Sequence, residues 1–285
     1  MSLSERRKIR GPWRASRQPP LPWVLRLYRK SVLKQEKFRA IERFLPTLAG
    51  KTCLDVGGDN GVISYLLRER GGTWHSADLP EAVESIRKIL TENVHRLLGP
   101  QLPFPDEYFD LVVVIDYMEH IQEDRAFVEE LFRVLRPGGE VIVNVPHAKG
   151  GAVLRPIRLS LGLTDERHGH VRPGYREEEL RRLLGEFFTI KQVATYSRFF
   201  SQAIDTVFGF IHGRFGGGKG EETSKGIIVT QKDFESDPKA FLFASLIYPV
   251  CQLVVQLNRL AFFTKGYLLL VRAEKRADVP RPRFS

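Results

Sequence analysis

The fold of this chain is decided by residues 53–61, which read Cys53-Leu54-Asp55-Val56-Gly57-Gly58-Asp59-Asn60-Gly61. The first four form a short apolar strand, and a helix is expected to begin directly after the stretch, at Val62. A glycine-rich turn between a strand and a helix lets a ligand approach backbone N–H groups at the helix N-terminus. The spacing is not Gly-x-Gly-x-x-Gly, because Asp59 takes the second glycine position and Val62 the third. This argues against a nicotinamide-dependent dehydrogenase.

Apolar strands and amphipathic helices alternate from residue 52 onward. The strands are expected at 52–56, 73–77, 94–99, 111–115, 141–145, 189–194 and 267–272, and the helices at 62–70, 80–93, 123–135 and 177–187. Alternation of this kind predicts an α/β fold with a doubly wound, mostly parallel seven-stranded sheet and helices on both faces. A further amphipathic helix, expected over 23–45, precedes the first strand.

The composition divides the chain into four parts. Residues 1–22 form a basic arm that we expect to be flexible, and residues 23–197 hold the alternating core. Residues 198–265 form an apolar insertion, with helices expected at about 199–211 and 240–263 around a glycine-rich loop at 213–226. Residues 266–285 hold the last strand and a basic tail. Three explanations of the insertion are open: a lid over a substrate cleft, a dimer contact, or a membrane contact.

The positive charge is concentrated at the start of the chain. The net charge is +10 in 285 residues, and residues 1–40 hold twelve lysines and arginines against only Glu5 and Glu36. Such an arm is open to three explanations: binding of RNA phosphates, contact with an anionic membrane, or a solvated tail. Two cysteines are too few for a disulfide scaffold, and no apolar signal sequence is seen. We therefore expect a cytoplasmic location, with attachment to the inner face of the membrane as an alternative.

Further motifs surround the strand expected at 111–115. It is preceded by Leu102-Pro103-Phe104-Pro105-Asp106-Glu107-Tyr108-Phe109-Asp110 and followed by Asp116-Tyr117-Met118-Glu119-His120, and the next helix ends at Arg136-Pro137-Gly138-Gly139. Over residues 35–200, this run resembles the class I S-adenosylmethionine-dependent methyltransferases. It is most similar to the methyltransferase type 11-like subgroup, which has an LPFPD-x-x-FD segment and an EH pair. The resemblance implies a Rossmann-like sheet and S-adenosyl-L-methionine as the cofactor.

The resemblance also implies where the cofactor binds. The glycines of the turn would pass close to its methionine part, Asp78 would hold the ribose, and Asp116 would lie near the sulfonium. The residues placed on the cofactor in this way are Asp55, Gly57, Gly58, Asp59, Gly61, Asp78, Leu79 and Asp116. Two positions depart from the subgroup: Asp59 stands at the middle glycine of the usual loop, and Leu98 stands where an acid usually contacts the adenine. Adenine recognition would then rest on backbone groups and apolar contacts.

Three histidines are candidates for catalysis: His120, His147 and His170. The first two follow strands at the sheet edge where the methyl group is expected, and imidazole suits deprotonation of a hydroxyl group near neutral pH. The third is a candidate for substrate contact. The His168-x-His170 pair has no cysteine nearby, so no metal site is expected.

The sequence thus predicts an enzyme, an S-adenosylmethionine-dependent methyltransferase that acts on an oxygen atom of a small-molecule, glycan or lipid-linked acceptor. Two alternatives stay open: an RNA methyltransferase guided by the basic arm, and a non-catalytic scaffold that keeps the fold. For partners, an anionic membrane surface reached through residues 1–40 and 198–263 and a homodimer are both considered, with nucleic acid less favoured.

Overall fold

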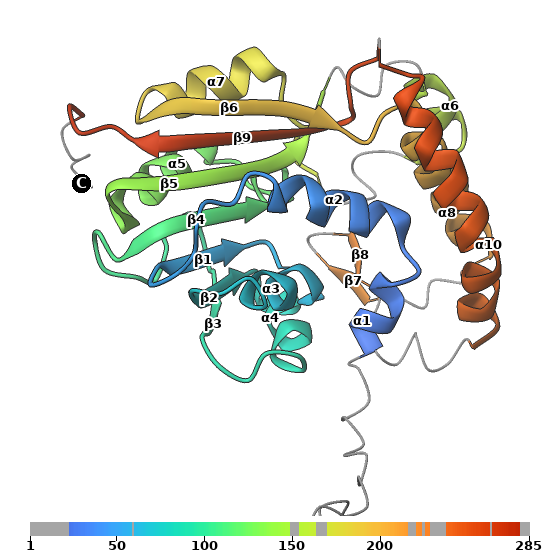
Figure 1. The fold of residues 1–285 in the computed structure, drawn as a ribbon, viewed down its shortest axis with the longest axis horizontal. Coiled ribbons are helices and arrows are strands. Elements are labelled where there is room, and N and C mark those ends of the chain that lie inside the picture. The colour runs from blue at the N-terminus through green and yellow to red at the C-terminus, as the bar shows by residue number, and fades with distance from the viewer. Residues whose placement is uncertain are drawn as a thin grey trace, which may run out of the picture.

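A seven-stranded sheet organises the computed structural model, which describes residues 23–58, 60–148, 154–163, 170–215, 221–223, 226–228, 238–262 and 264–279. The strand order is β3-β2-β1-β4-β5-β9-β6 (Figure 1). The strands are β1 (Thr52–Val56), β2 (Thr73–Asp78), β3 (Val94–Arg96), β4 (Phe109–Ile115), β5 (Leu135–Pro146), β6 (Phe188–Tyr196) and β9 (Leu268–Lys275). Five strands from β3 to β5 are parallel, and β9 is antiparallel to both β5 and β6. The predicted doubly wound, mostly parallel sheet is confirmed.

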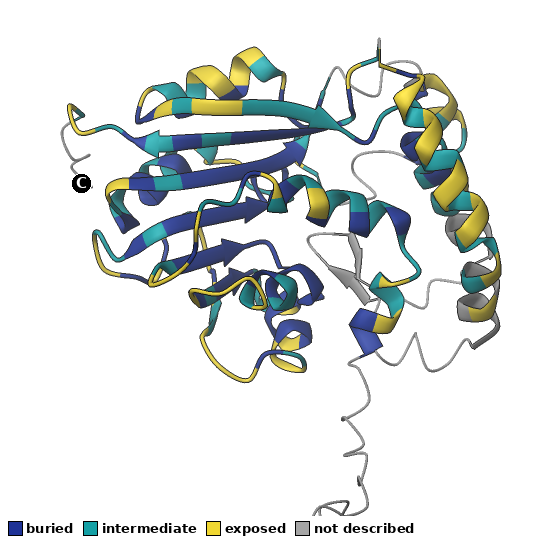
Figure 2. Ribbon diagram, in the orientation of Figure 1, coloured by how far each residue is buried: buried dark blue, intermediate teal, exposed yellow. Residues whose placement is uncertain are grey.

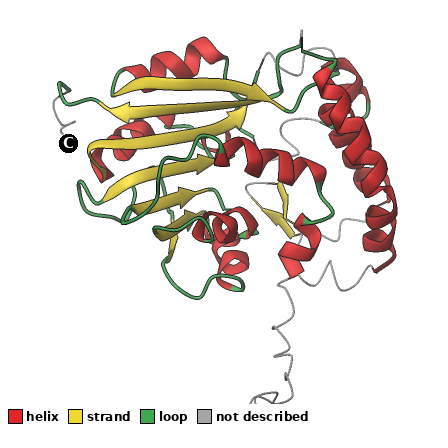
Figure 3. Ribbon diagram, in the orientation of Figure 1, coloured by secondary structure: helices red, strands yellow, loops and turns green. Residues whose placement is uncertain are grey.

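Helices cover both faces of the sheet, as Figure 3 shows. Alternate residues of β4 point to opposite faces, as the two-residue repeat of a strand requires. Val112 and Val114 pack with α5 (Asp124–Val134) and α7 (Glu177–Gly185), whereas Leu111 and Val113 pack with α2 (Val32–Glu42) and α3 (Val62–Arg68). All four side chains are fully buried. This two-sided burial explains why β4 reads as an unbroken apolar run.

The single helix expected over 23–45 is wrong, because the structure has two helices there, α1 (Trp23–Tyr28) and α2. Ser31 has an extended backbone, and its side chain accepts a hydrogen bond from the Lys34 backbone N at 3.3 Å, which caps a new helix. The helix expected at 80–93 is also shorter, since α4 (Pro80–Arg87) is followed by turns and by Asn93 in a left-handed conformation.

Two long helices occupy the segment between β6 and β9. They are α8 (Phe199–Phe215) and α10 (Pro238–Gln256), followed by the short η4 (Leu257–Arg259), and α10 packs against both α8 and α2 (Figure 1). The glycine-rich loop expected at 213–226 holds the end of α8 and part of a small hairpin, β7 (Glu221–Thr223) with β8 (Gly226–Ile228). Its remaining residues lie outside the described ranges.

The outer side of α10 is apolar and exposed, as the yellow segments of Figure 2 indicate. The exposed residues follow one another at a spacing of three or four, which places them on one stripe of the helix: Leu242, Leu246, Val250 and Leu253, continued by Leu257 in η4. Within the described ranges, no helix combines the length and the apolar character that crossing a membrane requires.

Candidate functional site

A cavity of about 500 Å³ lies at the carboxyl ends of β1, β4 and β5. It is lined by the glycine turn after β1, by Asp116 after β4 and by His147 after β5. Lys37 of α2 and Gln202 of α8 line it from the other side. The carboxyl ends of neighbouring parallel strands meet at one edge, which is where open α/β sheets bind their ligands.

The glycine turn fits only with glycine at its first position. Gly57 has a φ of +94°, and a Cβ atom there would lie 1.9 Å from the Ile115 carbonyl oxygen. The turn therefore packs directly on the end of β4. Gly61, with a φ of +81°, is the N-cap residue of α3. Gly58 lies between them and lines the cavity, while Asp59 lies outside the described residues.

Asp55 is fully buried beneath the turn. Its carboxylate accepts hydrogen bonds from the hydroxyl groups of Ser64 at 2.5 Å and Ser76 at 2.7 Å, and Arg68 lies 3.4 Å away. Burial raises the pKa of Asp55, whereas Arg68 and the two serines act to lower it. These contacts tie β1 to α3 and β2, which fixes the turn from below. A direct contact between Asp55 and the cofactor stays a prediction.

Sequence reasoning missed Arg68, although a pattern for it exists. Ser64 and Arg68 are four residues apart on α3, so both face the same way, toward β1. Arg68 donates to the Ser76 hydroxyl at 2.9 Å and to the Ser64 carbonyl at 3.2 Å. It therefore partners the buried carboxylate of Asp55 and the polar groups around it.

Leu79 lines a second cavity, of about 410 Å³, and Asp78 directly precedes it in the chain. Asp78 is fully buried at the end of β2, and its Oδ1 accepts a hydrogen bond from the Leu79 backbone N at 2.7 Å. Leu79, Leu98 and Tyr117 line this cavity together with the polar residues Glu81, Gln122 and Glu123, and Leu98 is 90% exposed. A mixed lining of this kind, next to the strand end that carries Asp78, suits a ribose with a flat aromatic base.

Asp116 stands between two polar partners. It has a φ of +45°, forms an ion pair with Lys37 of α2, and accepts a hydrogen bond from the Asn144 side chain at 2.7 Å. Asn144 in turn accepts one from the Tyr196 hydroxyl at 2.5 Å, and burial raises the pKa of Tyr196. Asp116 is thereby oriented by β5, β6 and α2. No sequence pattern joins these four residues, so sequence reasoning missed the other three.

His147 is held in a defined orientation. It is buried, its backbone N donates to the Tyr267 carbonyl at 2.8 Å, and its Nδ1 lies 3.0 Å from the Gly266 carbonyl oxygen. Because a carbonyl oxygen only accepts, Nδ1 must carry the hydrogen in this contact, which is the tautomer that leaves the lone pair of an uncharged imidazole on Nε2. Nε2 has no hydrogen-bond partner among the described residues.

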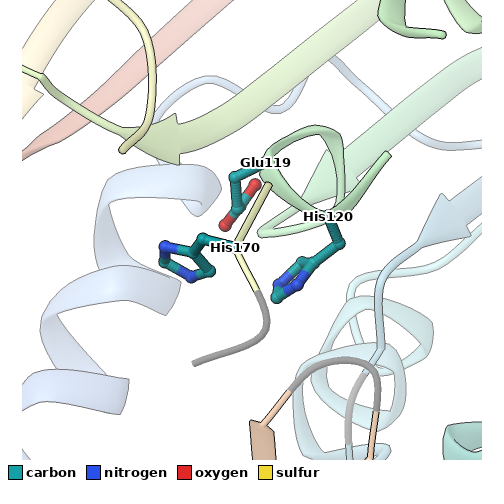
Figure 4. A group of neighbouring side chains, drawn as sticks. All are labelled: Glu119, His120 and His170. Atoms are coloured by element: carbon teal, nitrogen blue, oxygen red, sulfur yellow. The ribbon is translucent and has the colours of Figure 1, made fainter. Parts of the chain in front are cut away.

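His120 and His170 come together with Glu119 (Figure 4). The two rings are 4.9 Å apart at 80°, and one ligand atom from each of the three residues lies within 4.8 Å of the others. Glu119 and His120 belong to η2 (Met118–His120), directly after β4, whereas His170 comes from the segment before α7. All three line the cavity of about 500 Å³ that His147 also lines. His168 lies outside the described residues.

The architecture and these two cavities define a methyltransferase domain. A family model of the methyltransferase domain matches residues 28–187, more than half of the chain. The chain belongs to this family, is an enzyme, and has S-adenosylmethionine as its cofactor. The residues present fit that cofactor, since the glycine turn lines one cavity, the buried acid Asp78 ends the neighbouring strand, and Leu79 after it lines a second cavity of mixed polarity.

The chain is also similar to individual methyltransferases. A ubiquinone biosynthesis O-methyltransferase of Pseudomonas fluorescens is 31% identical over 120 residues, which cover 39% of this chain and 50% of the relative. The chain thus spans about half the length of the curated relatives it matches. An S-adenosylmethionine-dependent methyltransferase of Thermotoga maritima has a TM-score of 0.53 at 16% identity, over 89% of this chain and 93% of its own.

The same fold also supports other chemistry. The cyclase SpnF has a TM-score of 0.53 at 17% identity, covering 85% of this chain and 81% of its own. Structures this distant share the architecture, and the reaction has to be argued from the site.

Proposed function

We propose that this enzyme transfers the methyl group of S-adenosylmethionine to an oxygen atom of its acceptor, with His147 as the general base. The observation that carries this proposal is the orientation of His147, a residue that lines the cavity: its Nδ1 faces the Gly266 carbonyl, and its buried Nε2 has no hydrogen-bond partner among the described residues. A neutral imidazole with one committed nitrogen is suited to accept a proton at the other.

The residues divide the cofactor between them. The turn at Gly57 and Gly58 receives the methionine end, Asp78 accepts hydrogen bonds from the ribose hydroxyls, and the slot at Leu98 takes the adenine. Asp116 lines the first cavity and favours the positive charge of the sulfonium. At the adenine end, Leu98 supplies an apolar contact in place of a hydrogen-bonding acid.

The reaction needs one proton acceptor and a fixed line of attack. The acceptor hydroxyl gives its proton to His147 Nε2, and its oxygen attacks the methyl carbon, so that a C–O bond forms. The C–S bond breaks, and its electron pair stays on sulfur, which becomes the neutral thioether of S-adenosylhomocysteine. His147 then releases its proton to solvent. Most of the rate acceleration comes from positioning, because the sulfonium is already a good leaving group.

Cofactor binding is the first test. Calorimetric titration of the purified chain with S-adenosylmethionine should show micromolar binding, and Asp78→Ala should weaken it by at least about 10-fold, since one good charged hydrogen bond is worth roughly 1.5–3 kcal/mol. A matched control is Asp110→Ala, which removes a carboxylate at the opposite end of the sheet. Equal binding by wild type and Asp78→Ala would contradict the ribose assignment.

For the acceptor, we propose a lipid-linked hydroxyl compound presented at the inner face of an anionic membrane. The supporting feature is the exposed apolar stripe on α10. In the insertion proposed at residues 198–265, this stripe faces solvent, whereas α8 lines the cavity. An exposed apolar stripe, in a chain whose first 40 residues hold twelve lysines and arginines, suits an interfacial location. The relatives named for ubiquinone biosynthesis are in keeping with such an acceptor.

Vesicle sedimentation tests this location. The chain should sediment with vesicles containing anionic lipid at low salt and less with neutral vesicles, and the double change Leu246→Glu with Leu253→Glu should release it. Thr189→Glu with Lys191→Glu, two changes on β6 away from α10, serves as the control. A wild-type chain that stays in the supernatant would contradict the membrane proposal and leave cofactor binding unaffected.

A further inference from the structure

We propose that Glu119, His120 and His170 form a binding site for a divalent transition-metal ion in the acceptor cavity. One ligand atom from each residue lies within 4.8 Å of the other two, and Figure 4 shows the three side chains around a common space. In a tetrahedral site with ligands about 2.1 Å from the ion, ligand atoms lie about 3.4 Å apart. Binding of an ion therefore requires side-chain rotations that bring the ligand atoms closer together.

The donor set selects the kind of ion. Two imidazole nitrogens and one carboxylate oxygen suit Zn²⁺, Mn²⁺ or Fe²⁺, whereas Mg²⁺ and Ca²⁺ prefer oxygen ligands. Glu119 is 1% exposed and lines the cavity, so its carboxylate is shielded from open solvent. Three protein ligands leave at least one coordination position open, the arrangement found in catalytic rather than structural zinc sites.

The backbone around the three side chains is strongly supported. The Val171 backbone N donates to the Glu119 carbonyl at 2.9 Å, which fixes the residue after His170 to the end of η2. Arg172 donates to the Ile121 and Gln122 carbonyls, each at 3.0 Å. These bonds hold the segment that carries His170 against η2. A ligand set held in this way is preorganised for an ion.

Further support comes from the buried side chain of Tyr175. Its hydroxyl group lies 3.2 Å from the Met118 carbonyl and 3.0 Å from the Asp124 carboxylate. Arg172 also forms an ion pair with Asp124. These contacts fix the backbone at the start of η2 to the segment that carries His170.

The position of the site gives the ion a role. It lines the same cavity as His147, so an acceptor oxygen bound to the open coordination position would lie within the acceptor site. A bound cation lowers the pKa of a coordinated hydroxyl group and stabilises the oxyanion that attacks the methyl carbon. This role rests on the proposed function, whereas ion binding itself does not. It also assigns His120 and His170 as ligands and leaves His147 as the base.

Metal binding can be measured directly on the full chain. After treatment with a chelator, the protein is dialysed to equilibrium against Zn²⁺ and, separately, Mn²⁺, and the bound metal is counted. Co²⁺ is added in a parallel sample, because its visible absorption reports coordination geometry. The variants are Glu119→Gln and His170→Ala, and the control is His95→Gln, a half-buried histidine of β3 that lies outside the cavity. Cofactor titration of each metal-free variant shows that it is folded.

The expected result is one ion per chain for wild type and for His95→Gln. Glu119→Gln and His170→Ala should weaken binding by more than the roughly 10–100-fold that loss of an outer contact costs. Cofactor affinity should stay within a few-fold of wild type. The inference is overturned if wild type binds no stoichiometric ion, or if the two variants retain wild-type affinity. A wild-type chain that binds one ion but does not bind S-adenosylmethionine would instead overturn the proposed function.

Discussion

Replacing Gly57 with alanine tests the claim that the glycine turn must press against β4. The new Cβ atom would lie 1.9 Å from the Ile115 carbonyl oxygen and 3.2 Å from Tyr117 Cβ. Relieving the first contact requires a movement of more than 1 Å in a packed backbone, which costs roughly 1–3 kcal/mol. The left-handed φ of +94° adds about 1–2 kcal/mol for a residue with a side chain. We expect a total loss of about 2–5 kcal/mol.

Gly50→Ala is the matched control for this change. Gly50 also has a left-handed φ, of +73°, but nothing lies within 4 Å of the Cβ it would gain. It should therefore lose only the conformational part, about 1–2 kcal/mol. Urea unfolding gives both free energies, and calorimetry should show weakened cofactor binding for Gly57→Ala alone, because Asp116 moves with Ile115. If the two variants lose the same stability, the close approach has no energetic cost and our reasoning is wrong.

Three further changes test other parts of the site. His147→Gln should lower kcat/KM by about 10²–10⁴-fold while cofactor affinity stays unchanged, and a parallel loss of cofactor binding would argue against a base role. Lys37→Met should tighten cofactor binding a few-fold in calorimetry, because the lysine competes with the sulfonium for Asp116. In urea unfolding, the same change should alter the free energy of unfolding by less than about 1 kcal/mol. Burial lowers the pKa of His75 and His95, so the unfolded chain binds protons first and stability should fall as the pH drops below about 6.5. A denaturation series from pH 7 to pH 5 should show a smaller decline for His95→Gln, and an equal decline would exclude the pair as its source.

Local sequence was sufficient to predict the position of most strands of the sheet. β1 has the expected bounds because its apolar run ends at glycines that no strand continues, and α3 starts where the turn predicts. β5 was harder, because it begins at Leu135, before the Arg136-Pro137-Gly138-Gly139 turn. A register shift between Phe109 and Leu111 of β4 allows it to pair on both sides of that turn. A motif typical of helix ends thus lies within a strand.

The site was only partly predictable. Asp78 and Asp116 could be located, since Asp78 ends β2 and Asp116 directly follows β4, and both strand ends lie at the ligand-binding edge. The cluster of Glu119, His120 and His170 could not, because its members meet only once β5 and the following segment have folded back across η2. Lys37 was hidden for the same reason: α2 reaches the cavity by packing on the sheet, and an exposed-looking lysine on an amphipathic helix gives no indication of that contact.

The position of β9 has a consequence for how this protein is made. β9 is the last strand that the structure describes, yet it lies between β5 and β6 in the sheet. A nascent chain that has emerged only as far as α10 therefore leaves both β5 and β6 with an unpaired inner edge, which is prone to pairing with other chains. Closing the sheet also requires β9 to pair with β6, although α8 and α10 separate the two strands in the sequence. Pairing between strands so far apart in sequence is slow. Completion of the sheet must wait for residues 268–275, so a chaperone that shields these edges during synthesis would raise the yield of folded enzyme.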